Sequence, residues 1–340
     1  MPNTTAVRTA QVGAAPFFAG KNKIINGDFG VWQRGTSFTL AASTRSYTAD
    51  RFNAIYVGSS QVTTVSQQIF TAGTAPVAGY EGQFFLRYAV TGTTTGNTAN
   101  QVRQPIEDVR TFAGQTATFS FWAKADTNRA LTVYFSQNFG SGGSSEVFTA
   151  NQTVNITSTW ARYSVNVTLP SISGKTIGAG NNVTVNIEMP TATTQTIDFW
   201  GLQLEAGSTA TAFQTATGTI QGELAACQRY LPAIRGVYQP FMGYSTATNL
   251  SYVFFPYPVT ARVVPTGITV SSVSHFQMIS GAGSPGIPTA IAYDSFNTGI
   301  NGAGLTISTT VGSPTLVQGQ GGYMRITDVS GSILFTGCEL

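Results

Sequence analysis

Strand-length segments that alternate apolar and polar residues are the feature that most constrains how this chain can fold. In residues 116–124, Phe119 and Phe121 alternate with Ser120 and Trp122, which places the two kinds of side chain on opposite faces of a strand. The same two-residue period recurs in residues 131–136, 161–168 and 182–188. Turn-forming residues separate these segments, and no helical pattern lies between them. The sequence therefore predicts an all-β protein that begins with a β-sandwich or jelly roll.

One segment near the middle of the chain has a helical period instead. Ile220, Leu224 and Cys227 recur at helical spacing, Thr219 is placed as an N-cap, and Pro232 would end the helix. Strand-like segments resume after it. We therefore expect the jelly roll to be followed by a short helix and a second, smaller β-sandwich.

These patterns divide the chain into four parts. Residues 1–20 lack periodicity and are expected to be an N-terminal arm that orders only by docking. Residues 21–215 form the predicted jelly roll, and residues 216–240 a helical linker. Residues 241–340 form the predicted C-terminal β-sandwich.

The charge content excludes several classes of protein. Only 9% of residues are charged, and the net charge is +3. The basic residues do not gather into the dense stripe that nucleic acids require, and no apolar run approaches the length of a membrane span. With 11% aromatic residues, the chain is not a disordered one either. We expect no nucleic-acid partner and no membrane insertion.

Residues for catalysis are scarce. The single histidine, His275, lies in a strand-like segment and is expected to be satisfied by a neighbour, since no Gly-x-Ser-x-Gly motif supplies a nucleophile. One histidine with the remote Cys227 and Cys338 does not make a zinc site, and both thiols are expected to be buried and reduced. We expect no enzyme. Because glycoside hydrolysis needs only two carboxylates, a polysaccharide depolymerase stays open as an alternative.

Aromatic residues on the polar faces of two strands give the positive signal. Trp122 and Tyr134 both lie opposite the apolar residues of their strands, and Lys124 shares the face of Trp122. An exposed aromatic platform flanked by hydrogen-bonding groups suits a sugar ring. Trp122, Tyr134 and Lys124 are therefore the candidate saccharide-binding residues. In the alternative interpretation, a loop, the N-terminal arm or a neighbouring subunit covers these rings.

Several blocks of sequence resemble a family of bacteriophage tail-fibre and virion-surface proteins. The blocks are residues 23–35 (KIINGDFGVWQRG), 47–52 (YTADRF), 119–126 (FSFWAKAD), 197–207 (IDFWGLQLEAG) and 223–230 (ELAACQRY). They occur in the family's order over some 200 residues. The resemblance implies that the first domain is similar to a carbohydrate-binding module with a jelly-roll fold.

The same resemblance implies a metal site. In the family, an Asn-Gly-Asp/Gly-Phe opening and an aspartate in the closing strand often flank a structural calcium ion, and Asp28 and Asp198 stand at those positions. Phe199 replaces the usual second acid beside the closing aspartate. The alternative is that Asp28 is an ordinary turn or capping residue. No other cofactor is expected.

The resemblance also implies a biological setting. It indicates a virion structural protein, tail-fibre-like and homotrimeric, made in the bacterial host cytoplasm and then displayed on the tail or capsid surface. Its β-sandwich modules are expected to bind host-surface saccharide, and residues 1–20 to contact other virion proteins. A capsid decoration or head-fibre protein with a purely structural role is the alternative.

Overall fold

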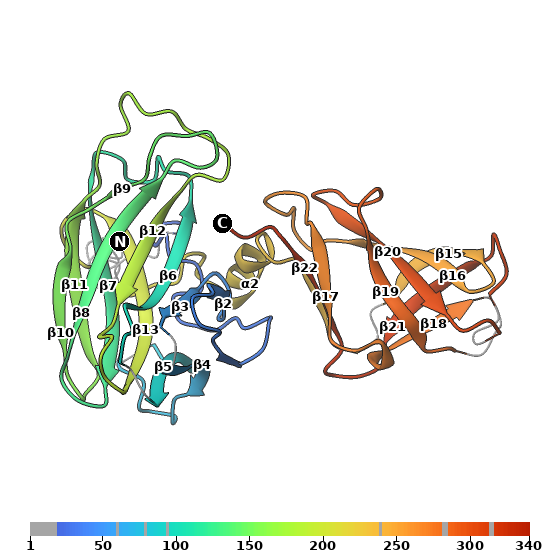
Figure 1. Cartoon of the computed structure of the whole chain (residues 1–340), viewed down its shortest axis with the longest axis horizontal. Coiled ribbons are helices and arrows are strands. Elements are labelled where there is room, and N and C mark those ends of the chain that lie inside the picture. The colour runs from blue at the N-terminus through green and yellow to red at the C-terminus, as the bar shows by residue number, and fades with distance from the viewer. Residues whose placement is uncertain are drawn as a thin grey trace, which may run out of the picture. The chain divides into compact units, whose positions relative to one another are not determined.

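The computed structural model describes residues 19–58, 61–77, 80–92, 95–237, 240–280, 285–312 and 316–340 (Figure 1). The chain forms two compact units, which we call unit 1 (Met1–Leu224, with Leu340) and unit 2 (Ala225–Glu339). Most of the expected docking arm, residues 1–18, lies outside the described residues.

Unit 1 is built from two antiparallel sheets. In spatial order, sheet A contains β1 (Ser37–Thr39), β4 (Gln61–Ile69), β5 (Phe84–Gly92), β13 (Gln195–Ala206), β7 (Thr116–Ala125) and β11 (Ala161–Thr168). Sheet B contains β10 (Gln152–Ile156), β8 (Arg129–Asn138), β12 (Asn182–Glu188), β6 (Ala99–Glu107), β3 (Asn53–Val57) and β2 (Ser46–Tyr47), and β9 (Val147–Phe148) pairs with β8. Consecutive strands often belong to different sheets, as in a jelly roll.

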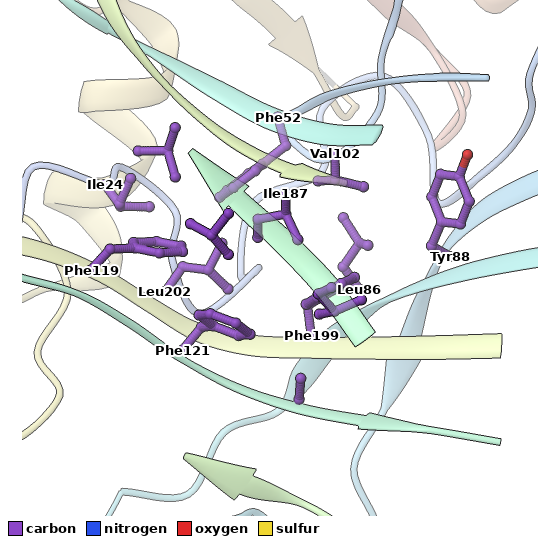
Figure 2. Close-up of a cluster of buried hydrophobic side chains, with 14 of the residues drawn as sticks. Ile24, Phe52, Leu86, Tyr88, Val102, Phe119, Phe121, Ile187, Phe199 and Leu202 are labelled. Carbon is purple, nitrogen blue, oxygen red and sulfur yellow. The ribbon is translucent and has the colours of Figure 1, made fainter. Parts of the chain in front are cut away.

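The core of unit 1 fills the space between the two sheets. Phe119, Phe121 and Phe199 project from sheet A, and Val102 and Ile187 from sheet B, into one buried cluster (Figure 2). The alternation seen in the sequence predicted these inward faces, because successive strand side chains point to opposite sides. The predicted jelly-roll β-sandwich is confirmed.

Unit 2 is the second, smaller sandwich that the sequence predicted. Its three-stranded sheet contains β14 (Ala233–Arg235), β22 (Ser332–Thr336) and β17 (Gly267–Val270). Its six-stranded sheet contains β18 (Phe276–Ser280), β21 (Gly321–Ile326), β15 (Phe241–Ala247), β16 (Leu250–Pro256), β20 (Gly302–Thr309) and β19 (Pro288–Asp294). Side chains from both sheets share one core, in which the rings of Phe255 and Phe335 are stacked 5.8 Å apart.

His275 and the two cysteines have structural surroundings. His275 ends a 3₁₀ turn, η1 (Val273–His275), where its Nδ1 lies 2.9 Å from the hydroxyl of Ser271. The side chains of Cys227 and Cys338 are both buried, as expected. In the part of the chain that the structure describes, no helix is long and apolar enough to cross a membrane.

Helix α2 (Ile220–Gln228) begins on unit 1. The Thr219 hydroxyl accepts the backbone N–H of Gly222 at 3.0 Å, which is the predicted N-cap. Glu223, in the first turn, is buried and accepts the backbone N–H groups of Asn26 and Thr217, both at 2.7 Å. The helix start is therefore fixed to the loop that follows Lys23.

Candidate functional site

Trp122 lies on the outer face of sheet A, as its position in β7 predicted, but it is not exposed. Only 8% of its surface is accessible, because Phe213 and Trp200 pack against its ring. The guanidinium of Arg162 lies 4.6 Å from the ring centroid. Gly201, at φ +64°, leaves room that a side chain would close, since its Cβ would lie 2.7 Å from the Trp122 ring. The expectation of an exposed Trp122 is wrong, and the loop after β13 covers it.

Lys124, the second candidate on β7, is also engaged by other side chains. Its Nζ lies 3.6 Å from Asp198 Oδ2 and 5.4 Å from the centroid of the Trp160 ring. Tyr134, by contrast, is on β8 of sheet B. The three candidates therefore do not share one surface, because β7 and β8 follow one another in sequence but belong to opposite sheets.

Asp28 and Asp198, the predicted calcium ligands, have separate partners in the structure. Asp198 is 2% exposed and accepts two hydrogen bonds from Arg87, at 2.7 and 2.9 Å. Asp28 accepts the hydroxyl of Tyr80 at 3.0 Å and, at 3.4 Å, the backbone N–H of Gly30. Calcium needs six to eight oxygen ligands, and no group of three or more His, Cys, Asp or Glu residues among the described residues could hold a metal ion.

The two carboxylates differ in their surroundings. Two cations, Arg87 and Lys124, already pair with Asp198, whereas burial raises the pKa of Asp28 because its charged form is desolvated. The contact of Asp28 with Gly30, two residues on, matches the alternative of a turn residue. These contacts favour an ion-pair role for Asp198 and a turn role for Asp28 over a shared calcium site.

The outer face of sheet B carries a continuous row of polar side chains around Tyr134. Asn53 of β3 is opposite Arg103 of β6, Arg103 is opposite Asn186 of β12, and Asn186 is opposite Tyr134 of β8. The row forms because four strands from distant parts of the sequence pair in register. It brings hydrogen-bonding groups of several types to one surface.

Hydrogen bonds connect the side chains at the Tyr134 end of this row. The amide of Gln101 donates to the Tyr134 hydroxyl at 2.8 Å, and that hydroxyl donates to Glu188 Oε1 at 3.1 Å. Burial, together with the charge of Glu188, raises the pKa of Tyr134 to about 12. Tyr134 is half-buried, so these bonds orient a ring that still reaches solvent.

The guanidinium groups of Arg45 and Arg103 lie at the other end of this row, near Asn53. Arg45 donates to Gln101 Oε1 at 3.1 Å and to Asn53 Oδ1 at 3.3 Å, and Arg103 donates to the same Asn53 oxygen at 2.9 Å. Burial, reinforced by the nearby charge of Arg45, lowers the pKa of Arg103 to about 10. Both groups are charged at neutral pH. We call Arg45, Asn53, Gln101, Arg103, Tyr134 and Glu188 the Tyr134 network.

An exposed aromatic ring lies beside the Tyr134 network. Phe148 of β9 is 58% exposed, and its ring centroid lies 6.1 Å from that of Tyr134 with an interplanar angle of 53°. The surface thus combines an aromatic pair with hydrogen-bond donors and acceptors. Sequence reasoning found Tyr134 but missed the other members, whose alternating polar positions in β6 and β12 look like any solvated strand face. The strand order β8-β12-β6-β3 in sheet B was the missing information.

Unit 2 has a separate apolar surface on its six-stranded sheet. Met242 and Tyr244 of β15 and Phe254 of β16 are exposed, and the Tyr244 and Tyr252 rings lie 6.2 Å apart. We call Met242, Tyr244, Tyr252 and Phe254 the unit 2 apolar face. A cavity of about 250 Å³ lies over it, with Asp294 and Asn297 at one side.

No protein-family model matches the chain, and no curated protein sequence is significantly similar to it. Several solved structures are similar in fold. A structure described as a CBM4 is 25% identical over 42% of this chain and 87% of its own, with a TM-score of 0.28. A family 11 carbohydrate-binding module from Clostridium thermocellum, in complex with a β-1,3-1,4-mixed-linked tetrasaccharide, is 10% identical over 52% and 98%, with a TM-score of 0.31.

The enzymatically active domain of tailspike protein 4 from bacteriophage CBA120 is also similar. It is 14% identical over 55% of this chain and 22% of its own, with a TM-score of 0.32. The neighbours thus include carbohydrate-binding modules with a β-sandwich fold. At these TM-scores the similarity carries no argument about function, and the sandwich assignment stands on the strand pairing itself.

Proposed function

We propose that this chain is a tail-fibre-like structural protein of a bacteriophage virion whose unit 1 binds host-surface saccharide through the Tyr134 network. The sequence blocks that resemble phage tail-fibre proteins support the virion setting. The observation that carries the binding proposal is the half-buried Tyr134, held by Gln101 and Glu188 beside the exposed ring of Phe148.

The chemistry of this surface matches that of a sugar. A sugar ring has apolar C–H faces, which pack on aromatic rings, and hydroxyl groups, which both donate and accept hydrogen bonds. Tyr134 and Phe148 offer ring faces, Glu188 offers acceptors, and the guanidinium group of Arg103 offers donors. Because hydrogen bonds already hold these side chains, little rotamer entropy is lost when a ligand binds.

A glycan array with wild-type protein and the Tyr134→Ala variant tests the proposal. We expect the wild type to bind specific glycans and the variant to lose most of that binding while its unit 1 unfolds at a similar temperature. Tyr244→Ala, the same substitution on an exposed tyrosine of unit 2, is the matched control and should bind normally. If only the control variant loses binding, the site belongs to unit 2, and if no glycan binds the wild type, the binding proposal fails.

We propose binding without bond cleavage. Retaining glycosidases hold two carboxyl groups about 5 to 5.5 Å apart, and inverting ones hold them about 6.5 to 9.5 Å apart. Of the six residues of the Tyr134 network, only Glu188 carries a carboxyl group, and it accepts a hydrogen bond from the Tyr134 hydroxyl. The network itself therefore does not contain the pair of carboxyl groups that a glycosidase needs. Incubation with a polysaccharide that the protein binds should release no new reducing ends. Release that Glu188→Gln abolishes would establish a depolymerase instead.

The virion setting has its own test. We propose that residues 1–20 attach the protein to other virion proteins on the tail or capsid surface. Deletion of these residues should abolish incorporation into particles while the remaining protein still folds and binds glycan. Normal incorporation of the deletion variant would refute this part of the proposal.

A purely structural role in the capsid or tail is the second candidate function, and the unit 2 apolar face favours it. Exposed Met242, Tyr244 and Phe254 form a surface of the kind that protein–protein contacts cover. On this hypothesis, copies of the chain associate as a homotrimer through this face. Sedimentation should then give a trimer for the wild type and a smaller species for Met242→Ser with Phe254→Ser. A monomeric wild type would refute it.

A further inference from the structure

Two arginines meet on the Tyr134 network without a carboxylate between them. Arg45 and Arg103 both donate to the single oxygen Asn53 Oδ1, at 3.3 and 2.9 Å. Across the described ranges, the partners of these two guanidinium groups are neutral amide oxygens, and neither forms an ion pair. Like charges held this close repel one another, and each group keeps unused N–H donors.

The acidic and phenolic groups that face this pair are accounted for. Glu146, which is exposed, and the rings of Tyr47 and Tyr134 favour the charged form of both arginines from a distance. Glu188, the carboxylate of the Tyr134 network, accepts hydrogen bonds from Tyr134 and, at 3.4 Å, from Gln101. The two positive charges are thus attracted by Glu146 but are not paired.

Asn53 fixes the arrangement. Its side chain is fully buried, so its oxygen holds both guanidinium groups in place, and it serves as a positioning residue. A guanidinium binds carboxylate or phosphate through two parallel N–H···O bonds, more strongly than it binds a neutral acceptor. Arg103 is partly desolvated, as the lowering of its pKa to about 10 indicates, which strengthens such a bond.

We propose that the saccharide bound by the Tyr134 network is an acidic one, whose carboxylate or phosphate group lies between Arg45 and Arg103 while its ring packs on Tyr134 and Phe148. This inference rests on the proposed saccharide binding and names its ligand class. A uronic or other carboxylated sugar and a phosphorylated sugar share the required chemistry. The anion relieves the repulsion between the two arginines.

An array of carboxylated and phosphorylated glycans, each beside the neutral version of the same chain, tests the inference. We expect acidic glycans to bind about tenfold or more tightly than their neutral versions, with a marked weakening at high salt. The carboxylated and phosphorylated members distinguish the two sources of negative charge.

A variant of Arg103 and a matched control variant sharpen the test. Arg103→Gln should lower the affinity for the acidic glycan about tenfold and the affinity for its neutral version much less. Arg110→Gln removes the same charge from an exposed arginine of unit 1 that is paired with Asp108, and it should bind normally. Trp fluorescence checks that both variants fold.

Asn53→Asp is a nearly isosteric third variant. It places a carboxylate where the two arginines already converge, so it should raise the unfolding temperature and lower the affinity for acidic glycans more than the affinity for their neutral versions. If neutral versions bind as well as acidic ones, or if Arg103→Gln and Asn53→Asp change nothing, the inference is overturned while the proposed function stands. If neither kind of glycan binds the wild type, the proposed function itself fails.

Discussion

The Asp198→Asn variant tests which of two roles Asp198 has. In the structure Asp198 is the partner of an ion pair, whereas the sequence suggested that it is a calcium ligand. Asp198 is 2% exposed and accepts two hydrogen bonds from Arg87, and Lys124 lies 3.6 Å away. The asparagine side chain has nearly the same shape but no charge, and its amide nitrogen faces a cation. The change therefore removes the charge from this cluster and leaves the packing in place.

The expected loss of stability follows from the burial of the partners. Removing one partner of a fully buried ion pair costs about 3 to 5 kcal/mol. The side chains of Arg87 and Lys124 are each 33% exposed, so water takes over part of their solvation, and the asparagine oxygen keeps one acceptor. We therefore expect a loss of about 2 kcal/mol, which for a unit of this size lowers the unfolding temperature by about 4 to 8 °C.

Tryptophan fluorescence measures this change in unit 1 alone. All four tryptophans of the chain, Trp32, Trp122, Trp160 and Trp200, lie in unit 1. Urea unfolding of Asp198→Asn, Arg87→Gln and the double variant should give a coupling energy of about 1 to 2 kcal/mol between the two residues. Unfolding of the wild type should be the same with excess calcium and with a chelator.

Two results would refute this reasoning. An unchanged unfolding midpoint for Asp198→Asn would mean that the pair contributes nothing. A wild type that calcium stabilises, together with an Asp198→Asn variant that calcium leaves unchanged, would restore Asp198 as a metal ligand.

Three further predictions concern other buried or capping groups of unit 1. Trp122→Ala should destabilise unit 1 by about 3 to 5 kcal/mol and leave glycan binding by the folded protein intact; lost binding at unchanged stability would return the site to Trp122. Burial raises the pKa of Glu223 above its usual value. Between the usual pKa and the raised one, the folded state holds a proton that the unfolded state has released, so the stability of unit 1 should fall as the pH rises through this interval. Glu223→Gln should flatten this slope in urea unfolding at several pH values, and an equal slope would contradict the assignment. Thr219→Ala should cost about 1 kcal/mol in thermal unfolding, whereas Thr219→Ser should cost little; equal losses would mean that the cap is unimportant.

Local patterns in the sequence were sufficient to predict several strands, the start of the helix and the strand faces that line the core. The alternation of Phe119 and Phe121 with polar neighbours depends only on the geometry of a strand, and Thr219 caps the residues that follow it directly. Both are short-range effects. They therefore could be read from the residues themselves, together with the division into two β-sandwiches.

The candidate site depends on contacts that no local pattern contains. Trp122 and Tyr134 have the same pattern in sequence, yet Phe213, far along the chain, covers the first, while the second remains half-exposed on the opposite sheet. Arg103 becomes a neighbour of Asn53 and Asn186 only through strand pairing.

The sequence by itself thus determined which side chains face the core and which face outward, because that choice is made within each strand. Only the tertiary structure decided which outward-facing residues meet, which of them are covered, and where unpaired charge remains. Those properties depend on the order of strands in the sheets and on the loops that fold back over them.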